Sequence, residues 1–328
     1  MNDWNTDVIE QYELEVEQLR KGRGAWIFET NCGLKLLKEY KGSVRRLEFE
    51  EMILDSVKDS KTLRVDQYLR NKEGALISAA GDGTRYVVKD WFSERECDVK
   101  DYQEVLSAVR QIAALHKTLR AVEPREEWNL KSMIAPPLYE AMEKHNRELR
   151  KARTFIRGKQ RKNEFELSVI ANFDMFYEQA MEAQIGMQEL FSKETDAMKQ
   201  CCYICHGDLN QHHILMGKTY IAVTEFNKMH LGIQVEDLYD FMRKAMEKHE
   251  WNLDLGADIL DAYERILPLD AAEKACLRYL FLYPEKYWKQ INFYYNSNKA
   301  WIPARNTEKV KSLERQQEKR MKFLEQIL

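Results

Sequence analysis

The chain has 328 residues, 44% hydrophobic and 32% charged, with a formal net charge of −3. This length can bury sizeable cores in about one to three domains, and the balanced charge gives no overall attraction to nucleic acid or anionic membranes. Six cysteines are too few for a disulfide framework in a chain this long, so reduced thiols are expected. The acidic N-terminus argues against a signal peptide. No apolar run reaches the roughly 18 residues that a membrane span needs.

Hydrophobic spacing and turn residues predict a small α+β unit that ends near Trp91. Apolar positions at spacings of three and four predict helices over 8–20 and 45–57. β-prone runs on either side of the turn at 31–33 predict a hairpin over 25–40. Three further strands are predicted at 62–65, 75–80 and 85–91, the last two joined by a tight turn at Gly81-Asp82-Gly83.

From residue 98 onward the pattern is mostly helical. The segment 144–162 carries nine Lys or Arg residues against one Glu, and Gly158 is expected to separate two helices there. The predicted helices cover 98–116, 144–162, 165–190, 237–247, 258–266, 273–283 and 307–328.

One polar stretch interrupts the helices. It runs from Cys205 to Leu215, and nine residues later comes Thr224-Glu225-Phe226-Asn227. The pattern predicts a strand, a polar loop, a β-hairpin and a second loop that begins with an acid. Kinase-type phosphotransferases present two acids in this way, one toward a substrate hydroxyl and one toward a metal-bound nucleotide.

Several strings of residues resemble one family. They are His206-Gly207-Asp208, the basic helix at 148–153, and three downstream stretches at 237–244, 283–289 and 296–303. Over nearly its whole length the chain resembles the CotS-type spore-coat branch of the aminoglycoside and choline phosphotransferases. The resemblance implies an α+β, two-lobed protein-kinase-like fold. The N-lobe would cover 1–92, with a nucleotide-side β-sheet and one helix. The helical C-lobe would cover 93–328, with the catalytic-loop hairpin and a basic segment at 140–190.

The resemblance also assigns roles to individual residues. Asp208 would face the substrate hydroxyl, and His206 would brace the nearby backbone. On the nucleotide side, Lys38 would neutralise phosphates and Glu50 would hold that lysine, with Lys35 and Glu51 as the alternatives for uncertain register. Trp91 would begin the hinge between the lobes, Asp237 would brace the catalytic segment, and residues 21–24 would form either a shortened phosphate-covering loop or a plain turn.

The metal positions depart from the family pattern. The family has Asn five residues after the catalytic Asp and an Asp at the start of the second loop, where this chain has His213 and Glu225; Asn227 replaces a further acid. Imidazole is a poor ligand for Mg²⁺, and Glu reaches one methylene further than Asp. ATP and Mg²⁺ are therefore expected only if the protein is active, with Mn²⁺ as a softer alternative.

Three other patterns leave alternatives open. Residues 202–206 match the C-x-x-C-H pattern of c-type haem attachment, and the Cys and His residues over 201–213 could be combined into a zinc site. Neither is favoured, since an export signal is lacking and a strand points Cys202 and Cys205 to opposite faces. The basic stretch is either a solvated helix pair or a surface for an anionic acceptor, a coat protein or nucleic acid. The aromatic residues over 279–301 indicate core packing or a wall that binds sugar or peptide.

The preferred interpretation is a kinase-like spore coat protein, a degenerate phosphotransferase that acts in spore coat assembly. The alternative is an active ATP-dependent phosphotransferase for a small-molecule hydroxyl or a coat protein. An unrelated helical protein is the third. Other coat proteins are the expected partners, whereas nucleic acid and membranes are not. The resemblance places the protein in the mother-cell cytoplasm or in the spore coat.

Overall fold

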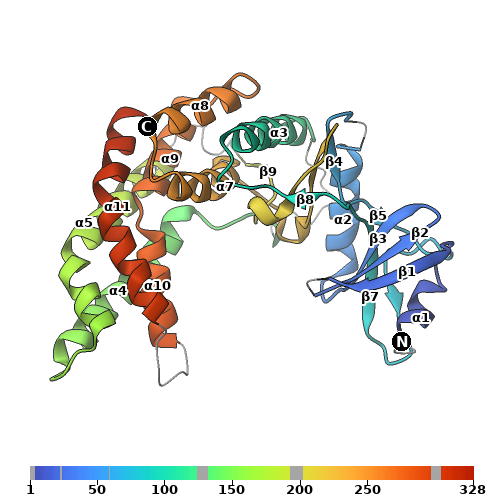
Figure 1. Ribbon diagram of the computed structural model, residues 1–328, viewed down its shortest axis with the longest axis horizontal. Coiled ribbons are helices and arrows are strands. Elements are labelled where there is room, and N and C mark those ends of the chain that lie inside the picture. The colour runs from blue at the N-terminus through green and yellow to red at the C-terminus, as the bar shows by residue number, and fades with distance from the viewer. Residues whose placement is uncertain (1–3, 23, 59, 124–131, 193–201, 297–303) are drawn as a thin grey trace. The chain divides into compact units, whose positions relative to one another are not determined.

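The computed structural model describes residues 4–22, 24–58, 60–123, 132–192, 202–296 and 304–328 (Figure 1). Contacts divide the chain into two compact units. The first combines Met1–Met133 with Tyr203–Leu231, and the second combines Ile134–Cys202 with Gly232–Leu328. This division places the predicted catalytic hairpin in the same unit as the N-terminal residues, whereas the predicted lobes place it in the C-lobe. A lobe boundary at residue 92 stays a prediction.

The first unit begins with an antiparallel sheet in the order β1-β2-β3-β7-β5, with β6 also paired to β7 (Figure 1). Helix α1 precedes the sheet, and α2 lies between β3 and β4 in the chain. The bounds are α1 (Trp4–Ile9), β1 (Val16–Lys21), β2 (Trp26–Thr30), β3 (Gly33–Glu39), α2 (Val44–Asp55), β5 (Tyr68–Leu69), β6 (Ser78–Ala79) and β7 (Arg85–Asp90).

The two faces of this sheet bury different sets of residues. Phe28, Leu37 and Val88 pack with Val8 and Tyr12 on one face. On the other face, Ile27 and Leu36 form a cluster with Ala25 and Trp91, and Leu47 of α2 packs against Val87. Since strand side chains alternate between faces, Lys38 lies on the same face as Leu36. That face is the one that positions the candidate site.

A second sheet carries the polar loops. It has the order β4-β11-β10-β8, and β4 runs parallel to β11 while the other pairs are antiparallel. Strands β9 and β12 form a separate pair, and helix α3 also belongs to this unit. The bounds are β4 (Leu63–Val65), β8 (Arg95–Glu96), α3 (Tyr102–Arg120), β9 (Tyr203–Cys205), β10 (Ile214–Met216), β11 (Ile221–Val223) and β12 (His230–Gly232).

Side-chain caps fix where the two longer helices of this unit begin. The Ser43 hydroxyl accepts from the backbone of Arg46 at the start of α2, and the Asp101 carboxylate accepts from two N–H groups of α3. Such caps satisfy the free N–H groups of a first helical turn.

The second unit is helical. Helix α5 packs against α4, α9 and α11, and α7 packs against α9. The bounds are α4 (Leu138–Gly158), α5 (Glu164–Ser192), α7 (Val235–Lys248), α8 (Leu253–Glu264), α9 (Ala271–Leu282), α10 (Glu285–Asn296) and α11 (Ala304–Gln326). The predicted break at Gly158 is confirmed, because α4 ends there. Within the described residues, no helix is both long and apolar enough to cross a membrane.

One predicted element is wrong, and some were not predicted. The expected helix over 8–20 is a short helix that ends at Ile9, followed by strand β1 from Val16. Pairing of β1 with β2 along the sheet outweighs the helical spacing of a few apolar residues. Two-residue strands β5 and β8 and helix α10 were not predicted. Cys201, Arg23 and residues 297–303 of the third downstream string lie outside the described residues.

Candidate functional site

Two parallel strands bring a buried acid next to the second polar loop. Val65 of β4 lies opposite Val223 of β11, and parallel strands leave a sheet at the same end. Asp66, which follows β4, is fully buried, and its Oδ2 accepts from the N–H of Glu225 at 3.1 Å. The same oxygen accepts from Lys89 Nζ of β7 at 3.0 Å. Burial raises the pKa of the Asp66 carboxyl above its usual value, although Lys89 opposes this shift.

Asp66 holds Glu225 in an unusual backbone conformation. Glu225 has φ 69° and ψ 49°, in the left-handed region that side chains other than Gly and Asn rarely adopt. Its carboxylate forms an ion pair with Lys38 Nζ of β3. Burial raises the pKa of Glu225, but the hydrogen bond and charge of Lys38 outweigh it and leave the pKa below its usual value. Glu225 is therefore an ionised acid already paired with a lysine.

The strand register distinguishes the two candidate lysines. Lys38 reaches Glu225 from the sheet face that carries Leu36, whereas Lys35 pairs with Asp90 at 2.6 Å. Trp91 packs against the cluster that contains Leu36, on the face of Lys38. The structure thus brings Lys38 and Glu225 together and places Trp91 on the same face of the sheet.

Glu50 does not join this pair among the described residues. Its carboxylate accepts from Arg46 Nε and from the Tyr68 hydroxyl, each at 2.6 Å. Arg46 in turn donates to the carbonyl of Met229, just after the second polar loop. The Tyr68 ring lies 4.2 Å from Lys89 Nζ. Glu50 therefore connects α2 to the second loop through Arg46, whereas the family resemblance implied that Glu50 would hold Lys38. The alternative, Glu51, pairs with Arg70.

The first polar loop presents Asp208 beside a third lysine. Gly207 has φ +81°, and a Cβ there would lie 2.2 Å from the Lys228 carbonyl oxygen, so only Gly fits. Lys228 Nζ donates to Asp208 Oδ2 at 2.8 Å, and Asn210 Nδ2 donates to Oδ1 at 3.3 Å. Burial raises the pKa of Asp208, but Lys228 outweighs it and lowers the pKa below its usual value.

Two histidines brace this loop. The buried His206 ring donates from Nε2 to the carbonyl of Thr224 at 2.9 Å and accepts from the N–H of Asp208 at 3.2 Å. It therefore links the two polar loops, as the resemblance implied. His213 donates from Nδ1 to the carbonyl of Asp208 at 2.7 Å, which leaves Nε2 as its acceptor atom.

These residues do not fit a Mg²⁺ ion. Mg²⁺ takes hard oxygen ligands in octahedral geometry, whereas the predicted metal positions offer one carboxylate and one imidazole. The carboxylate of Glu225 is bound to Lys38, and Asn227 offers only an exposed amide in place of the further acid. No group of three or more His, Cys, Asp or Glu side chains within the described residues is arranged as a metal site.

Sequence reasoning missed Lys228, Asp66 and Lys89. Lys228 lies three residues after Glu225, so its proximity to the second loop could have been predicted from the sequence. The pair of Asp66 and Lys89 carried no local signal, because it depends on strand pairing between distant segments.

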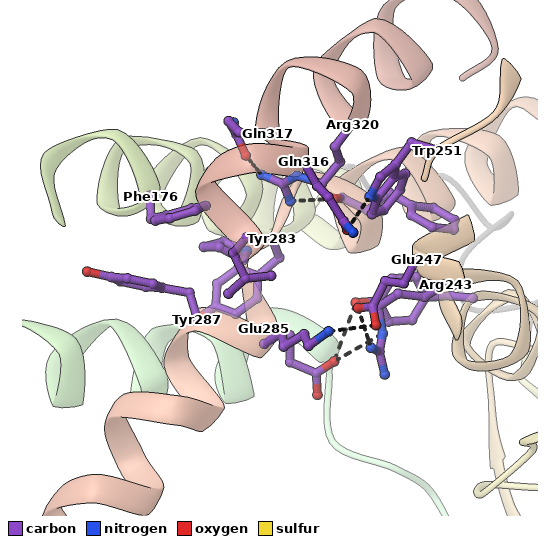
Figure 2. A pocket seen from close by; sticks show the side chains of 15 residues that line it. Phe176, Arg243, Glu247, Trp251, Tyr283, Glu285, Tyr287, Gln316, Gln317 and Arg320 are labelled. Carbon is purple, nitrogen blue, oxygen red and sulfur yellow. Dashed lines mark hydrogen bonds and ion pairs between the residues drawn. The ribbon is translucent and has the colours of Figure 1, made fainter. Parts of the chain in front are cut away.

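Two of the downstream strings meet in the helical unit. Arg243 of the first string and Glu285 of the second line a cavity of about 40 Å³ (Figure 2). Around it, Glu247 accepts from Arg243 at 3.1 Å and from Lys286 at 2.8 Å. Such a cavity has room for about one or two water molecules, far below the ~300–1,000 Å³ of ligand pockets.

The aromatic residues over 279–295 divide between the core and the surface. Phe281, Tyr283 and Tyr287 are almost fully buried, whereas Phe293 is 46% exposed. Asp237 is also buried, in keeping with its predicted structural role.

Solved structures identify the fold class. An aminoglycoside phosphotransferase from Alicyclobacillus acidocaldarius matches with a TM-score of 0.84 at 16% identity, covering 98% of this chain and 94% of that chain. Amicoumacin kinase hAmiN, solved with AMP-PNP, Ca²⁺ and Ami, matches with a TM-score of 0.60 at 12% identity, covering 97% and 92%. Spectinomycin phosphotransferase APH(9)-Ia, solved with ADP and spectinomycin, matches with a TM-score of 0.59 at 12% identity, covering 92% and 91%. The fold is therefore the kinase-like fold of aminoglycoside phosphotransferases, with an antiparallel-sheet N-lobe and a helical C-lobe.

The family is equally clear. The chain belongs to the spore coat family described as "Spore coat putative kinase YutH", whose family model matches residues 5–327. No curated protein matches the chain. The predicted fold and the predicted spore-coat kinase family are both confirmed.

Proposed function

We propose that this protein is a pseudokinase of the spore coat, which binds a nucleotide without efficient phosphoryl transfer and acts in coat assembly. The observation that supports it is the ion pair of Glu225 with Lys38, next to an imidazole at the other metal position. Transfer requires charge neutralisation of the phosphates, chiefly by metal ions. Here Lys38 already neutralises the carboxylate at one metal position, and Lys228 neutralises Asp208. The protein would work in the mother-cell cytoplasm or the coat.

A thermal-shift experiment tests this proposal. A ligand at about 100 Kd adds roughly 2.7 kcal/mol of stability, which raises the melting temperature visibly. ATP with EDTA is expected to stabilise the protein, and added Mg²⁺ is expected to add nothing. Lys38→Met should abolish the shift, whereas Lys35→Met, on the other face of the sheet, should retain it. No shift with ATP under any metal condition would contradict nucleotide binding.

The second candidate function is an active phosphotransferase that uses ATP on a small-molecule hydroxyl or a coat protein. It is favoured by Asp208, which is ionised and has a half-exposed carboxylate on the loop where a hydroxyl would bind. Mn²⁺ is the metal to test, because it accepts imidazole more readily than Mg²⁺ does. Phosphate release with ATP and Mn²⁺ that disappears in Asp208→Asn would establish this function and overturn the pseudokinase proposal.

A further inference from the structure

A groove runs between the basic helix α4 and helix α10, which pack side by side (Figure 1). Its volume is about 440 Å³, and all of its lining residues belong to the helical unit. Its apolar and aromatic lining consists of Ala152, Phe155, Trp288, Ile291 and Tyr295, and Lys151 also lines it. This volume falls within the ~300–1,000 Å³ of sites that hold ligands.

The aromatic side of the groove is exposed and yet held in place. Phe155 is 57% exposed, and its ring meets Tyr295 edge to face at a centroid distance of 5.4 Å. The contact with Tyr295 therefore fixes the Phe155 ring while more than half of that side chain stays accessible to a partner.

The charge on α4 indicates the kind of partner. Lys144, Arg150, Lys151 and Arg157 are exposed, and no carboxylate among the described residues pairs with them. Glu148, the one acid among the described residues that line the groove, accepts from the Trp288 indole N–H at 2.8 Å. Such cations on α4, of which Lys151 lines the groove, attract a negatively charged partner.

We propose that this groove docks an acidic segment of a partner protein, with one aromatic or long aliphatic side chain inserted beside Phe155. Single-stranded RNA suits it less, because base stacking needs free aromatic faces. One face of Trp288 is covered by His145, whose ring stacks on it at a centroid distance of 3.4 Å. The proposal does not depend on the proposed nucleotide binding.

Fluorescence anisotropy with the full chain tests the anchor. The probe is a short fluorescein-labelled peptide of Glu and Asp residues around one Phe, and the comparison peptide has Ser in place of that Phe. Phe155→Ser is expected to weaken binding of the first peptide about tenfold or more, as for a buried aromatic anchor. Leu167→Ser changes a side chain of similar exposure, 55%, outside the groove and should leave binding unchanged.

A second pair of variants tests the charge. Lys151→Glu should weaken binding at low salt, with a smaller effect at high salt. Lys322→Glu makes the same charge change on an exposed part of α11 and should leave binding unchanged.

Several outcomes would overturn the proposal: no binding of the acidic peptide, equal losses in the control variants, or tighter binding of a labelled RNA oligonucleotide. All four variants should melt like the wild type and keep its ATP-dependent thermal shift, which separates this test from that of the nucleotide site.

Discussion

Lys228 Nζ donates a hydrogen bond to Asp208 Oδ2 at 2.8 Å, although the two residues lie on different loops. Glu225 of the second loop is likewise paired with a lysine, Lys38 of strand β3. Both acids stay ionised, and each is neutralised by a lysine before any ligand arrives. A phosphate group must therefore compete with a carboxylate for each ammonium group.

Replacing Lys228 should remove the cation that neutralises the Asp208 carboxylate. Lys228→Met should raise the pKa of Asp208, because burial remains and the opposing cation is gone. The wild type should be more stable at pH 7 by no more than about 1 kcal/mol, as for other exposed pairs. Since the folded pKa is lowered, this difference should vanish as pH falls through that pKa. Urea unfolding at pH 7 and near pH 3 measures it, with Lys144→Met as a control that breaks no ion pair among the described residues.

The first polar loop should not tolerate a Cβ at Gly207. Gly207→Ala combines a positive φ with a contact of 2.2 Å to the Lys228 carbonyl oxygen. Gly24→Ala is the matched control, since Gly24 has φ +67° but nothing within 4 Å of the added Cβ. The control should cost about 1–2 kcal/mol from backbone strain alone, and Gly207→Ala distinctly more. Equal losses in urea unfolding would show that the backbone of the second loop moves aside freely.

Two acids of α7 should make the protein less stable as pH rises. Burial and then Asp240 raise the pKa of Glu236 to about 8, while burial and then Glu285 raise the pKa of Asp240 to about 7. In the unfolded chain both carboxyls titrate near pH 4, so the folded state binds protons that the unfolded state releases. Stability is therefore expected to fall between about pH 4 and pH 8.

Replacing one of these acids tests this pH dependence. Glu236→Gln should unfold at a higher temperature than the wild type at pH 8, and the difference should shrink toward pH 5. Glu182→Gln, on the exposed side of α5, should show no such trend. If the pH dependence of stability in Glu236→Gln matches that of the wild type, the raised pKa of Glu236 is contradicted.

Arg320 is expected to be a major stabilising residue of the helical unit. Its buried guanidinium donates from Nη1 to the carbonyls of Phe281 at 3.0 Å and Leu282 at 3.3 Å, at the end of α9. Burial lowers its pKa to about 10, so it stays charged at neutral pH. Arg320→Leu leaves these carbonyls unpaired and should cost about 2–4 kcal/mol. Arg315→Leu, at a side chain that is 64% exposed, should cost little by the same urea titration.

Local patterns predicted the helices of the C-terminal half other than α10, and the hairpin around residues 31–33, because spacing and turn residues act over a few positions. The same reasoning failed at 8–20, where pairing with β2 decides the outcome. Asp208, Glu225 and Lys38 could be placed from the motif and the family resemblance. The Asp66–Lys89 pair could not, since it arises only when β4 lies parallel to β11.

The sheet β4-β11-β10-β8 joins residues 63–65 and 95–96 to residues 214–223. During synthesis on the ribosome, β4 and β8 must wait without their partners until the hairpin emerges, on the order of ten seconds later at typical translation rates. Unpaired strand edges recruit other chains. Nascent chains that stop before residue 223 should therefore need a chaperone to stay free of aggregates, whereas the full-length chain closes its own sheet.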